Sequence, residues 1–169
     1  MIYLREINKT DISTLNKWRN DKEIIDTLGS VFRYINEETD LNWFENYMRT
    51  RTNNVRLAIC TQGNDALVGV VNLTNIDWQN RNAEFSIMIG EKTSQGKGYG
   101  TEATTMMIKH CFENLNLHRL YLHVLDYNTK AIDMYKKVGF KEEGKLKQCI
   151  YKNNKYHDML VMGLVQENN

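Results

Sequence analysis

The sequence predicts one domain of the α/β or α+β class, built on a mixed β-sheet. The chain has 169 residues, which is enough to bury one core without disulfide or metal support. No repeat, low-complexity linker or sharp shift in composition divides it. Strand-like and helix-like apolar periodicities follow one another in the order β-α-α-α-β-β-β-α-β-α-β-β. Helices that separate strands in this way indicate a sheet that is not purely antiparallel.

The chain begins with a short strand and an amphipathic helix. Residues 2–7 alternate between apolar and polar side chains, as a half-buried strand does. Thr10 or Asp11 can accept the first free N–H groups of a helix and cap it. One face of this helix is then apolar, with Ile12, Leu15 and Trp18 at helical spacing. We therefore expect the helix to pack on the sheet through these three side chains.

Two further helices are expected before the second strand. The first is short and covers residues 22–28. The second begins after Asn36, which can cap it, and has Glu37 and Glu38 in its first turn, where acids are stabilised. Its apolar stripe consists of Leu41, Phe44, Tyr47 and Met48.

Three strands are expected in the middle of the chain. Residues 55–61 and 67–74 are rich in β-branched and apolar side chains, and the polar turn 62–65 between them predicts a hairpin. A second polar turn at 79–81 precedes the next strand, at 82–89.

The last part of the chain contains two helices and three strands. The first helix is expected over 101–115, with Ala103, Met107, Cys111 and Leu115 at i+4 spacing. The second is capped by Asn128, runs to Lys137 and is stopped by Gly139. The strands are expected at 120–125, at 149–151 and at 159–165, with the last two joined by a turn at 152–155.

A glycine-rich loop with the sequence Gln95-Gly96-Lys97-Gly98-Tyr99-Gly100 lies between a strand and a helix. Such a loop can gather backbone N–H groups around an anion at the positive end of the helix, although a plain tight turn has the same appearance. A P-loop is excluded because Lys97 is followed by Gly98 rather than Ser or Thr. A dinucleotide or kinase fingerprint is excluded because the sixth position from Gly96 is Thr101.

Composition narrows the possible functions. The formal net charge of +1 gives no electrostatic reason to expect nucleic acid or an acidic membrane as partner. The chain shows neither a transmembrane segment nor a signal peptide, so we expect a cytoplasmic protein. Cys60, Cys111 and Cys149 are expected to be reduced core thiols. No metal site is expected, because the four histidines show no His-x-x-x-His pair.

Two sequence blocks resemble the GNAT family of acyl-coenzyme A N-acyltransferases. Gln95, Gly98 and Gly100 fill the fixed positions of the family's pyrophosphate loop, Gln/Arg-x-x-Gly-x-Gly/Ala. The second block is Asn128-x-x-Ala131-x-x-x-Tyr135-x-Lys137-x-Gly139-Phe140. Residues 83–85 and 115–121 are similar to a branch of the family that holds ribosomal-protein N-terminal and spermidine acetyltransferases, together with amino-sugar and antibiotic-modifying enzymes. This resemblance implies an amine acceptor and little beyond it.

The resemblance also implies a fold and a cosubstrate. The expected sheet is mostly antiparallel, and its central strands 85–89 and 120–125 splay apart to form a cleft for acetyl-coenzyme A. Within one acetyltransferase domain, 1–169, residues 1–54 form the acceptor side, 55–140 the coenzyme-binding core and 141–169 a C-terminal hairpin. The expected coenzyme-binding residues are Ile87, Met88, Ile89, Gln95, Gly96, Lys97, Gly98, Tyr99, Gly100, Thr101, Asn128, Ala131 and Tyr135.

Acetyl transfer to an amine requires a base, an oxyanion donor and an acid. Tyr135 is the expected acid for the departing thiolate, and the backbone N–H groups of 85–89 are the expected oxyanion donors. Glu84 is the expected base, since an acid is rare in an apolar strand; the alternative is a rim carboxylate paired with Arg81 or Arg119. Direct transfer in a ternary complex is preferred, because Cys111 falls on an apolar helix face and is expected to be inert.

The sequence leaves the acceptor open. Acidic residues in the N-terminal helices favour a polyamine, whereas Trp18-Arg19-Asn20-Asp21 is similar to enzymes that acetylate sugar-nucleotide amines, and a protein N-terminus fits equally well. We expect a small-molecule or peptide amine as partner and consider a homodimer. The alternative function is a catalytically inactive, coenzyme A-binding sensor or regulatory protein; an enzyme is favoured because Tyr135, Glu84 and the glycines are all present.

Overall fold

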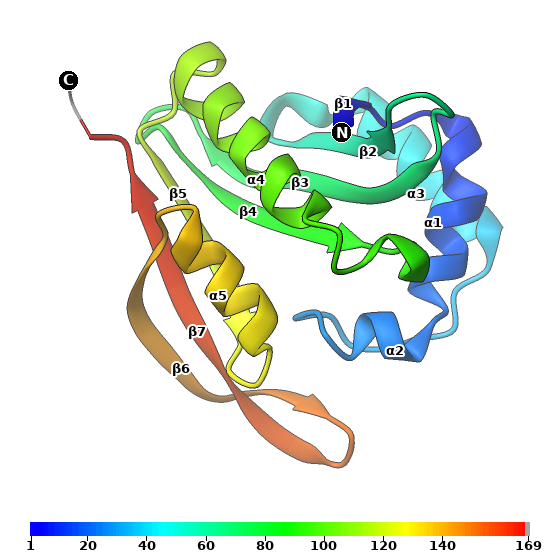
Figure 1. Cartoon of the computed structure of the whole chain (residues 1–169). Helices are drawn as coiled ribbons and strands as arrows, with labels where there is room; N and C mark the ends of the chain where they lie inside the picture. Colours follow the sequence, from blue (N-terminus) through cyan, green and yellow to red (C-terminus); the bar gives the residue numbers. More distant parts are fainter. Residues whose placement is uncertain (168–169) are drawn as a thin grey trace.

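The computed structural model describes residues 1–167 and contains one seven-stranded sheet with helices against both faces (Figure 1). The strands lie in the order β1-β2-β3-β4-β5-β7-β6, and every neighbouring pair is antiparallel except β4 and β5. The expected mixed, mostly antiparallel sheet is therefore confirmed. The strands are β1 (Ile2–Glu6), β2 (Val55–Thr61), β3 (Leu67–Asp77), β4 (Asn82–Ile89), β5 (Arg119–Leu125), β6 (Lys141–Lys152) and β7 (Lys155–Val165).

Five α-helices connect these strands in the predicted order. They are α1 (Ile12–Arg19), α2 (Lys22–Ile25), α3 (Glu37–Arg49), α4 (Tyr99–Lys109) and α5 (Thr129–Lys137). A π-helical turn, His110–Asn114, continues α4, and short 3-10 turns occur at Lys9–Asp11, Arg51–Asn53 and Lys92–Ser94. Helix α2 is shorter than the predicted 22–28, because only turn-type hydrogen bonds continue the chain to Leu28.

The predicted apolar faces of the N-terminal helices are confirmed with one exception. Ile12, Leu15 and Trp18 of α1 are buried. In α3 the side chain of Asn36 caps the helix by accepting the N–H of Thr39 at 3.0 Å, as predicted. The stripe of α3 is shifted, however, because Met48 is exposed and Asp40 is buried. A carboxylate can take this place only because polar partners on α1 neutralise it.

The final hairpin is longer than the sequence predicted. Strand β6 begins at Lys141, whereas the sequence predicted a start at Cys149. The prediction missed the first part of the strand because most of its side chains are exposed and show no apolar alternation. Backbone pairing with β7 defines the strand instead, with register shifts at Glu142/Gly144 and Leu146/Ile150. The edge position also explains why Cys149 is exposed rather than a core thiol, whereas Cys60 and Cys111 are buried as expected.

The core has two main parts, one on each face of the sheet. On one face Ala83 and Phe85 of β4 pack with side chains from α4 and α5, among them Met107 and Tyr135. On the other face, α1 and α3 pack on the sheet, and Met88 of β4 contacts their apolar side chains. These side chains are Ile12, Leu15, Trp18, Phe44 and Tyr47. Strand β4 therefore presents alternate side chains to two helical layers, as the two-residue period of a strand requires.

Lys152 joins the end of the β6–β7 hairpin to the segment that follows α2. Its ammonium group is buried and donates to the backbone oxygens of Ile25 and Leu28, both at 2.6 Å, and to that of Ser30 at 2.8 Å. Three carbonyl oxygens satisfy the three N–H donors of the ammonium group. This contact fixes the position of a loop that would otherwise have few backbone partners.

We predict that Lys152→Met lowers the free energy of unfolding by about 2–3 kcal/mol, because it removes the three hydrogen bonds that the buried ammonium group donates to the segment after α2. Lys155→Met removes the same charge from an exposed position, directly opposite Lys152 across the β6–β7 turn, and should change stability by less than about 0.5 kcal/mol. Urea unfolding of both variants measures the difference. Equal midpoints for the two variants would show that the Lys152 contact contributes nothing.

Candidate functional site

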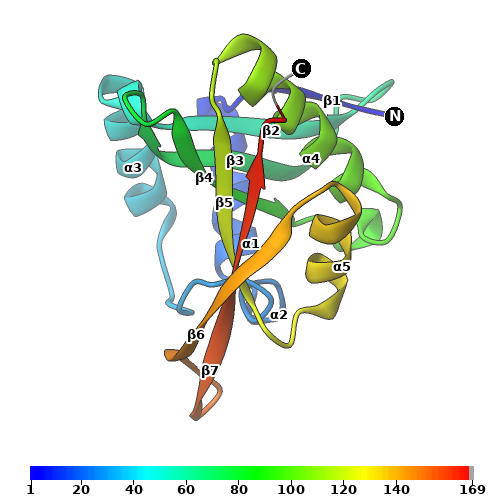
Figure 2. The same ribbon diagram turned by 90° about the vertical axis from the view of Figure 1, so that its left-hand side faces the viewer.

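The pairing of β4 with β5 stops after three residue pairs, Asn82↔Arg119, Ala83↔Leu120 and Glu84↔Tyr121. On its other side β4 stays paired with β3 as far as Ile89. In Figure 2 strands β1–β4 run across the view, whereas β5 and β7 run along its height, so the two parts of the sheet turn away from each other. Within the described residues, the edge of β4 from Phe85 onward therefore has no strand beside it, and its backbone groups are open to a ligand.

A cavity of about 1310 Å³ occupies this split. It is larger than the roughly 300–1,000 Å³ of common small-molecule pockets, so it has room for two ligands. One end is formed by the glycine loop and α5, and the other by α1, α3 and the loop that follows α2. Among the predicted binding residues, those on its wall are Ile87, Met88, Ile89, Gln95, Gly96, Gly98, Gly100, Thr101, Asn128, Ala131 and Tyr135.

The glycine loop is shaped to receive an anion. Gly96 and Gly98 have φ angles of 76° and 83°, and Gly98 is the residue that precedes the first turn of α4. A Cβ atom at Gly98 would meet no protein atom within 4 Å, so the space before the helix is open. The Gln95 amide group donates to the backbone oxygen of Ile89 at 2.9 Å and fixes the loop to the end of β4. Free N–H groups and the helix dipole thus face one space.

Two predicted loop residues lie away from the cavity wall. Lys97 is exposed. The pKa of Glu91 is lowered mainly by a hydrogen bond from the Thr93 hydroxyl and to a smaller extent by the nearby charge of Lys97. Tyr99 packs, partly buried, against the core on the α4 side of the sheet. Their roles in coenzyme binding stay predictions.

Helix α5 supplies the second predicted block. Asn128 caps the helix by accepting the N–H of Ala131 at 3.2 Å, and its amide group donates to the backbone oxygen of Thr27 at 2.9 Å. Tyr135 is buried, with its ring edge-to-face to Phe85 (centroids 6.2 Å apart). Burial raises the pKa of Tyr135 above its usual value, so its hydroxyl keeps its proton at neutral pH. A neutral phenol on the cavity wall can donate a proton or a hydrogen bond.

Glu84 occupies the last pair before the split and lines the cavity. One carboxylate oxygen lies 2.9 Å from Nδ1 of His123, and the other accepts from the Asn75 amide group at 3.0 Å. The alternative pairing predicted for Glu84 is wrong. Arg81 instead donates to the side-chain and backbone oxygens of Asn116, and Arg119 pairs with Glu143.

His123 is a cavity residue that the sequence analysis considered only as a possible metal ligand. It lies two positions after Tyr121 on β5, and side chains two apart share a face of a strand. Its position beside Glu84 follows from the parallel β4–β5 register, which no local pattern of the sequence indicated.

Glu84 and Tyr135 reach the split from opposite faces of the sheet. Ile87 and Ile89 pack on the same side as Tyr135, whereas Met88 contacts the α1 and α3 side. Because side chains alternate along β4, Glu84 shares the face of Met88. A carboxylate and a phenol can therefore act on one group held in the split, each from its own side.

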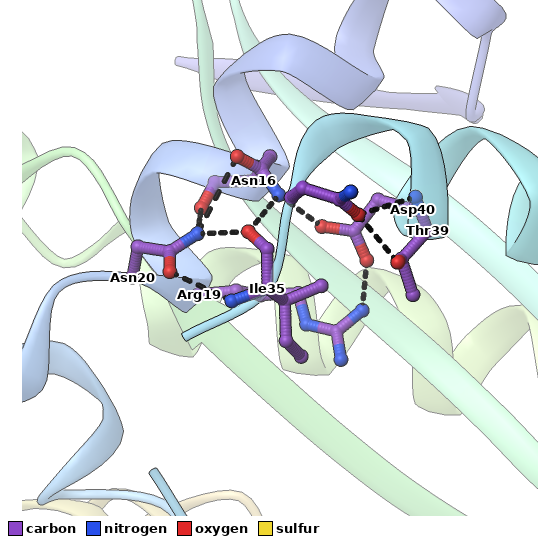
Figure 3. Close-up of polar contacts among 7 residues, drawn as sticks. Asn16, Arg19, Asn20, Ile35, Thr39 and Asp40 are labelled. Carbon is purple, nitrogen blue, oxygen red and sulfur yellow. Dashed lines mark hydrogen bonds and ion pairs between the residues drawn. The ribbon is translucent and has the colours of Figure 1, made fainter. Parts of the chain in front are cut away.

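Polar contacts hold α1, α3 and the segment between them together at the other end of the cavity (Figure 3). The buried carboxylate of Asp40 accepts from the Asn16 amide group at 2.7 Å and pairs with Arg19. The backbone oxygen of Ile35 accepts from the amide groups of Asn16 and Asn20 at 3.0 and 2.7 Å. The sequence analysis did not indicate these contacts, because they arise between segments that are distant in the chain.

Residues 1–167 hold no group of three or more His, Cys, Asp or Glu side chains that could bind a metal ion. In the same part of the chain, no helix combines the length and the apolar character needed to cross a membrane.

Comparison with known proteins gives three further findings. Residues 2–141 match the family model described as an acetyltransferase (GNAT) domain. The chain is 39% identical over 100 residues to spermidine N(1)-acetyltransferase of Vibrio cholerae, a match that spans 59% of this chain and 57% of that protein. It is 31% identical over 173 residues to the Escherichia coli K12 protein of the same name, spanning 98% of this chain and 86% of the other.

A third relative and a solved structure extend this result. The putative ribosomal N-acetyltransferase of Bacillus subtilis is 35% identical over 101 residues, which span 60% of this chain and 55% of that protein. The crystal structure of spermidine N-acetyltransferase from Vibrio cholerae in complex with CoA and spermine superposes with a TM-score of 0.89 at 28% identity, covering 98% of this chain and 95% of that one.

We predict that Gly98→Ala weakens coenzyme A binding by about 10–100-fold, because the methyl group fills the open space before the α4 N–H groups. Gly63→Ala is the matched control. Gly63 also has a positive φ, 101°, and open space around its Cβ position, but it lies in the β2–β3 turn. Both variants carry a similar backbone strain of roughly 1–2 kcal/mol. Calorimetry should show normal affinity for Gly63→Ala only, and equal affinities would contradict the loop assignment.

Proposed function

We propose, since this chain belongs to the acetyltransferase (GNAT) family, that it transfers the acetyl group of acetyl-coenzyme A to a primary amine by direct attack in a ternary complex. The observation that carries this proposal is the split between β4 and β5. One cavity there joins an anion-binding loop, an open strand edge, a carboxylate and a neutral phenol. Each of these groups meets one chemical requirement of acetyl transfer to an amine.

The cavity wall fits the coenzyme in two places. Backbone N–H groups of 96–101 suit its pyrophosphate, because the left-handed glycines leave the space before them free of side chains. The open edge of β4 at 87–89 suits the amide groups of its pantetheine arm, which can pair with the strand as a neighbouring strand would. When bound, the coenzyme supplies the activated acetyl thioester.

Proton transfers at the split are assigned to two side chains. An alkylammonium group has a pKa near 10.4, so forming the neutral amine at pH 7 costs about 4–5 kcal/mol. Glu84, oriented by His123 and Asn75, accepts this proton. As the new N–C bond forms and the C–S bond breaks, the Tyr135 hydroxyl donates its proton to the departing sulfur. A backbone N–H of 85–89 stabilises the oxyanion between these two events.

Direct attack is favoured over an acyl-enzyme. Cys111 is fully buried, and burial raises the pKa of its thiol to about 12. A thiol with this pKa is protonated at neutral pH and cannot act as nucleophile. Cys60 is also buried with a raised pKa, and it lies on β2, away from the split.

The relatives support two classes of amine. The two spermidine acetyltransferases and the complex with CoA and spermine support a polyamine, and the ribosomal N-acetyltransferase supports a protein N-terminus. A thiol-release assay against spermidine, peptides and amino sugars tests the proposal. Coenzyme A binding without thiol release for any amine would instead favour the alternative, an inactive sensor or regulatory protein.

We also propose a multimer in the cytoplasm. A dodecameric structure is known for the spermidine N-acetyltransferase of Vibrio cholerae, which this chain matches with a TM-score of 0.84 at 27% identity. That likeness supports a multimer but no particular number of subunits, so the homodimer considered from the sequence has no separate support. Light scattering of the purified chain measures its mass, and cell fractionation tests the compartment.

Tyr135→Phe should lower kcat by about 10²–10⁴-fold, the usual contribution of a positioned acid, and leave coenzyme A affinity nearly unchanged. The ring keeps its contacts with Phe85 and Phe140, so the fold should be retained. Tyr156→Phe removes the same hydroxyl from an exposed ring on β7 and serves as the control. If kcat of Tyr135→Phe equals that of the wild type, water or another group must donate the proton to the departing sulfur.

Glu84→Gln should lower kcat/KM at neutral pH and change its pH profile. In the wild type, kcat/KM rises with pH, because the fraction of neutral amine grows toward the amine's own pKa. Without the carboxylate, the neutral amine forms only through the amine's own loss of a proton, so the plateau of kcat/KM is lower and its rise with pH is steeper. Glu38→Gln, at an exposed position of α3, is the control. Profiles of the same shape for Glu84→Gln and wild type would exclude Glu84 as the base.

A further inference from the structure

Arg56 is an unpaired cation on the acceptor side of the cavity. It lies on β2, and its Nε is the one buried side-chain nitrogen or oxygen within residues 1–167 that has no hydrogen-bond partner. No carboxylate of the described residues forms an ion pair with its guanidinium group, whose nearest polar contact, from Nη1 to Oδ1 of Asn72, is 3.5 Å long. A half-buried guanidinium group whose Nε is fully buried and unbonded is partly desolvated without compensation, and a ligand with negative charge would supply the missing partner.

Two aromatic rings fix the orientation of this guanidinium group. Its central carbon lies 4.9 Å from the ring centroid of Trp43 and 5.6 Å from that of Tyr47. The two rings are stacked, with an interplanar angle of 13°, and Tyr47 also accepts the backbone N–H of Arg56. Stacking occupies the face of a guanidinium group and leaves its N–H edge for hydrogen bonds. That edge is the part that binds carboxylate or phosphate in a two-pronged manner.

The strand register places Arg56 in line with the reaction site. Arg56 pairs with Asn72 on β3, and Asn72 pairs with Ser86 on β4. All three residues line the cavity, and Ser86 is two positions from Glu84 on the same face. Strands lie about 4.8 Å apart, so the backbone of Arg56 is two strand spacings, about 10 Å, from β4. Its guanidinium group lies near Asn72 on β3, so a ligand that reaches it from the split spans one to two strand spacings, about 5–10 Å.

The other charges of this side do not complement a polyamine. Asp40 pairs with Arg19, and Glu23 pairs with Lys92. Glu84 is therefore the one carboxylate on the cavity wall, within the described residues, that has no Lys or Arg partner. Arg19, Arg33 and Arg56 all lie on the wall. A chain of several ammonium groups needs several free carboxylates. Within the described residues, the wall instead offers one carboxylate without a Lys or Arg partner, Glu84, and two guanidinium groups without a carboxylate partner, those of Arg33 and Arg56.

We propose that the preferred acceptor is a primary amine that carries an oxyanion, phosphate or carboxylate, about 5–10 Å from its nitrogen, and that Arg56 binds this oxyanion. The inference rests on the proposed function and narrows its acceptor class. The ammonium group is held at Glu84, and the oxyanion completes the ion pair that Arg56 lacks. Amines without an oxyanion, spermidine included, are then the weaker acceptors.

Matched acceptor pairs test the proposal. Glucosamine 6-phosphate and glucosamine share one amine and differ by a phosphate, and the amidated dipeptides Ala-Asp and Ala-Asn differ by a carboxylate. In wild type, kcat/KM should be about 10–100-fold higher for the anionic member of at least one pair, because a charge-assisted bond forms only there. The pair that shows the preference identifies the oxyanion as phosphate or carboxylate. Spermidine gives the value for an acceptor without an anion.

Substitution of Arg56 should remove the preference. Arg56→Met keeps the packing of the stem on Trp43, and the ratio within the preferred pair should fall to within about twofold of one. Arg56→Lys keeps a point charge and should give an intermediate ratio. Arg49→Met removes the same charge from an exposed position on α3 and should leave the ratio unchanged. Thermal unfolding checks the fold; Arg56→Met should not lower the melting temperature, because it removes a half-buried charge that has no counter-ion in the described residues.

Two results would overturn the proposal. One is a wild-type enzyme whose kcat/KM for spermidine, or for the neutral member of each acceptor pair, equals that for the anionic member. The other is an Arg56→Met variant that folds and keeps the full preference. If no amine releases thiol, the proposed function fails, and calorimetry of glucosamine 6-phosphate and the Ala-Asp amide on the coenzyme A complex decides the oxyanion site alone. Binding that Arg56→Met abolishes supports the site, and the absence of binding refutes it.

Discussion

The end of the β4–β5 pairing at Glu84 and Tyr121 is the constraint on which the site depends. These two strands form the single parallel pair of the sheet, and a sheet that stayed paired beyond it would close the cavity. Where the pairing stops, β4 keeps hydrogen bonds to β3 and has an open edge toward β5. The split therefore exposes backbone groups and also connects the two faces of the sheet, so that groups from α5 and from the α1–α3 side can meet.

Hydrogen bonds between distant segments keep this split open in a fixed shape. Gln95 ties the glycine loop to the end of β4, and Asn128 ties the start of α5 to the loop that follows α2. Lys152 ties the same loop to the last hairpin. Each of these side chains donates to backbone oxygens of a segment distant in the chain, so the cavity walls are held by specific polar contacts in addition to core packing.

The two ends of the cavity differ in character. At the end formed by the glycine loop and α5 the neutral backbone and glycines dominate, which suits a ligand whose pyrophosphate is bound through N–H groups. At the end formed by α1 and α3, the buried acid Asp40 is paired with Arg19, whereas Arg56 has no carboxylate partner among the described residues. Similarity to spermidine acetyltransferases and this distribution of charge point to different amines, and the matched acceptor pairs decide between them.

The sequence by itself determined the order of elements, the glycine loop and the block around Tyr135, because periodicity, caps and glycine spacing are local properties. Asn36 and Asn128 act as the predicted caps for the same reason. The tertiary structure alone decided the length of β6, the burial of Asp40, the Glu84–His123 contact and the isolation of Arg56. Each of these depends on which segments meet across the sheet, and a charged residue shows its role only when its partner, or the lack of one, is fixed in space.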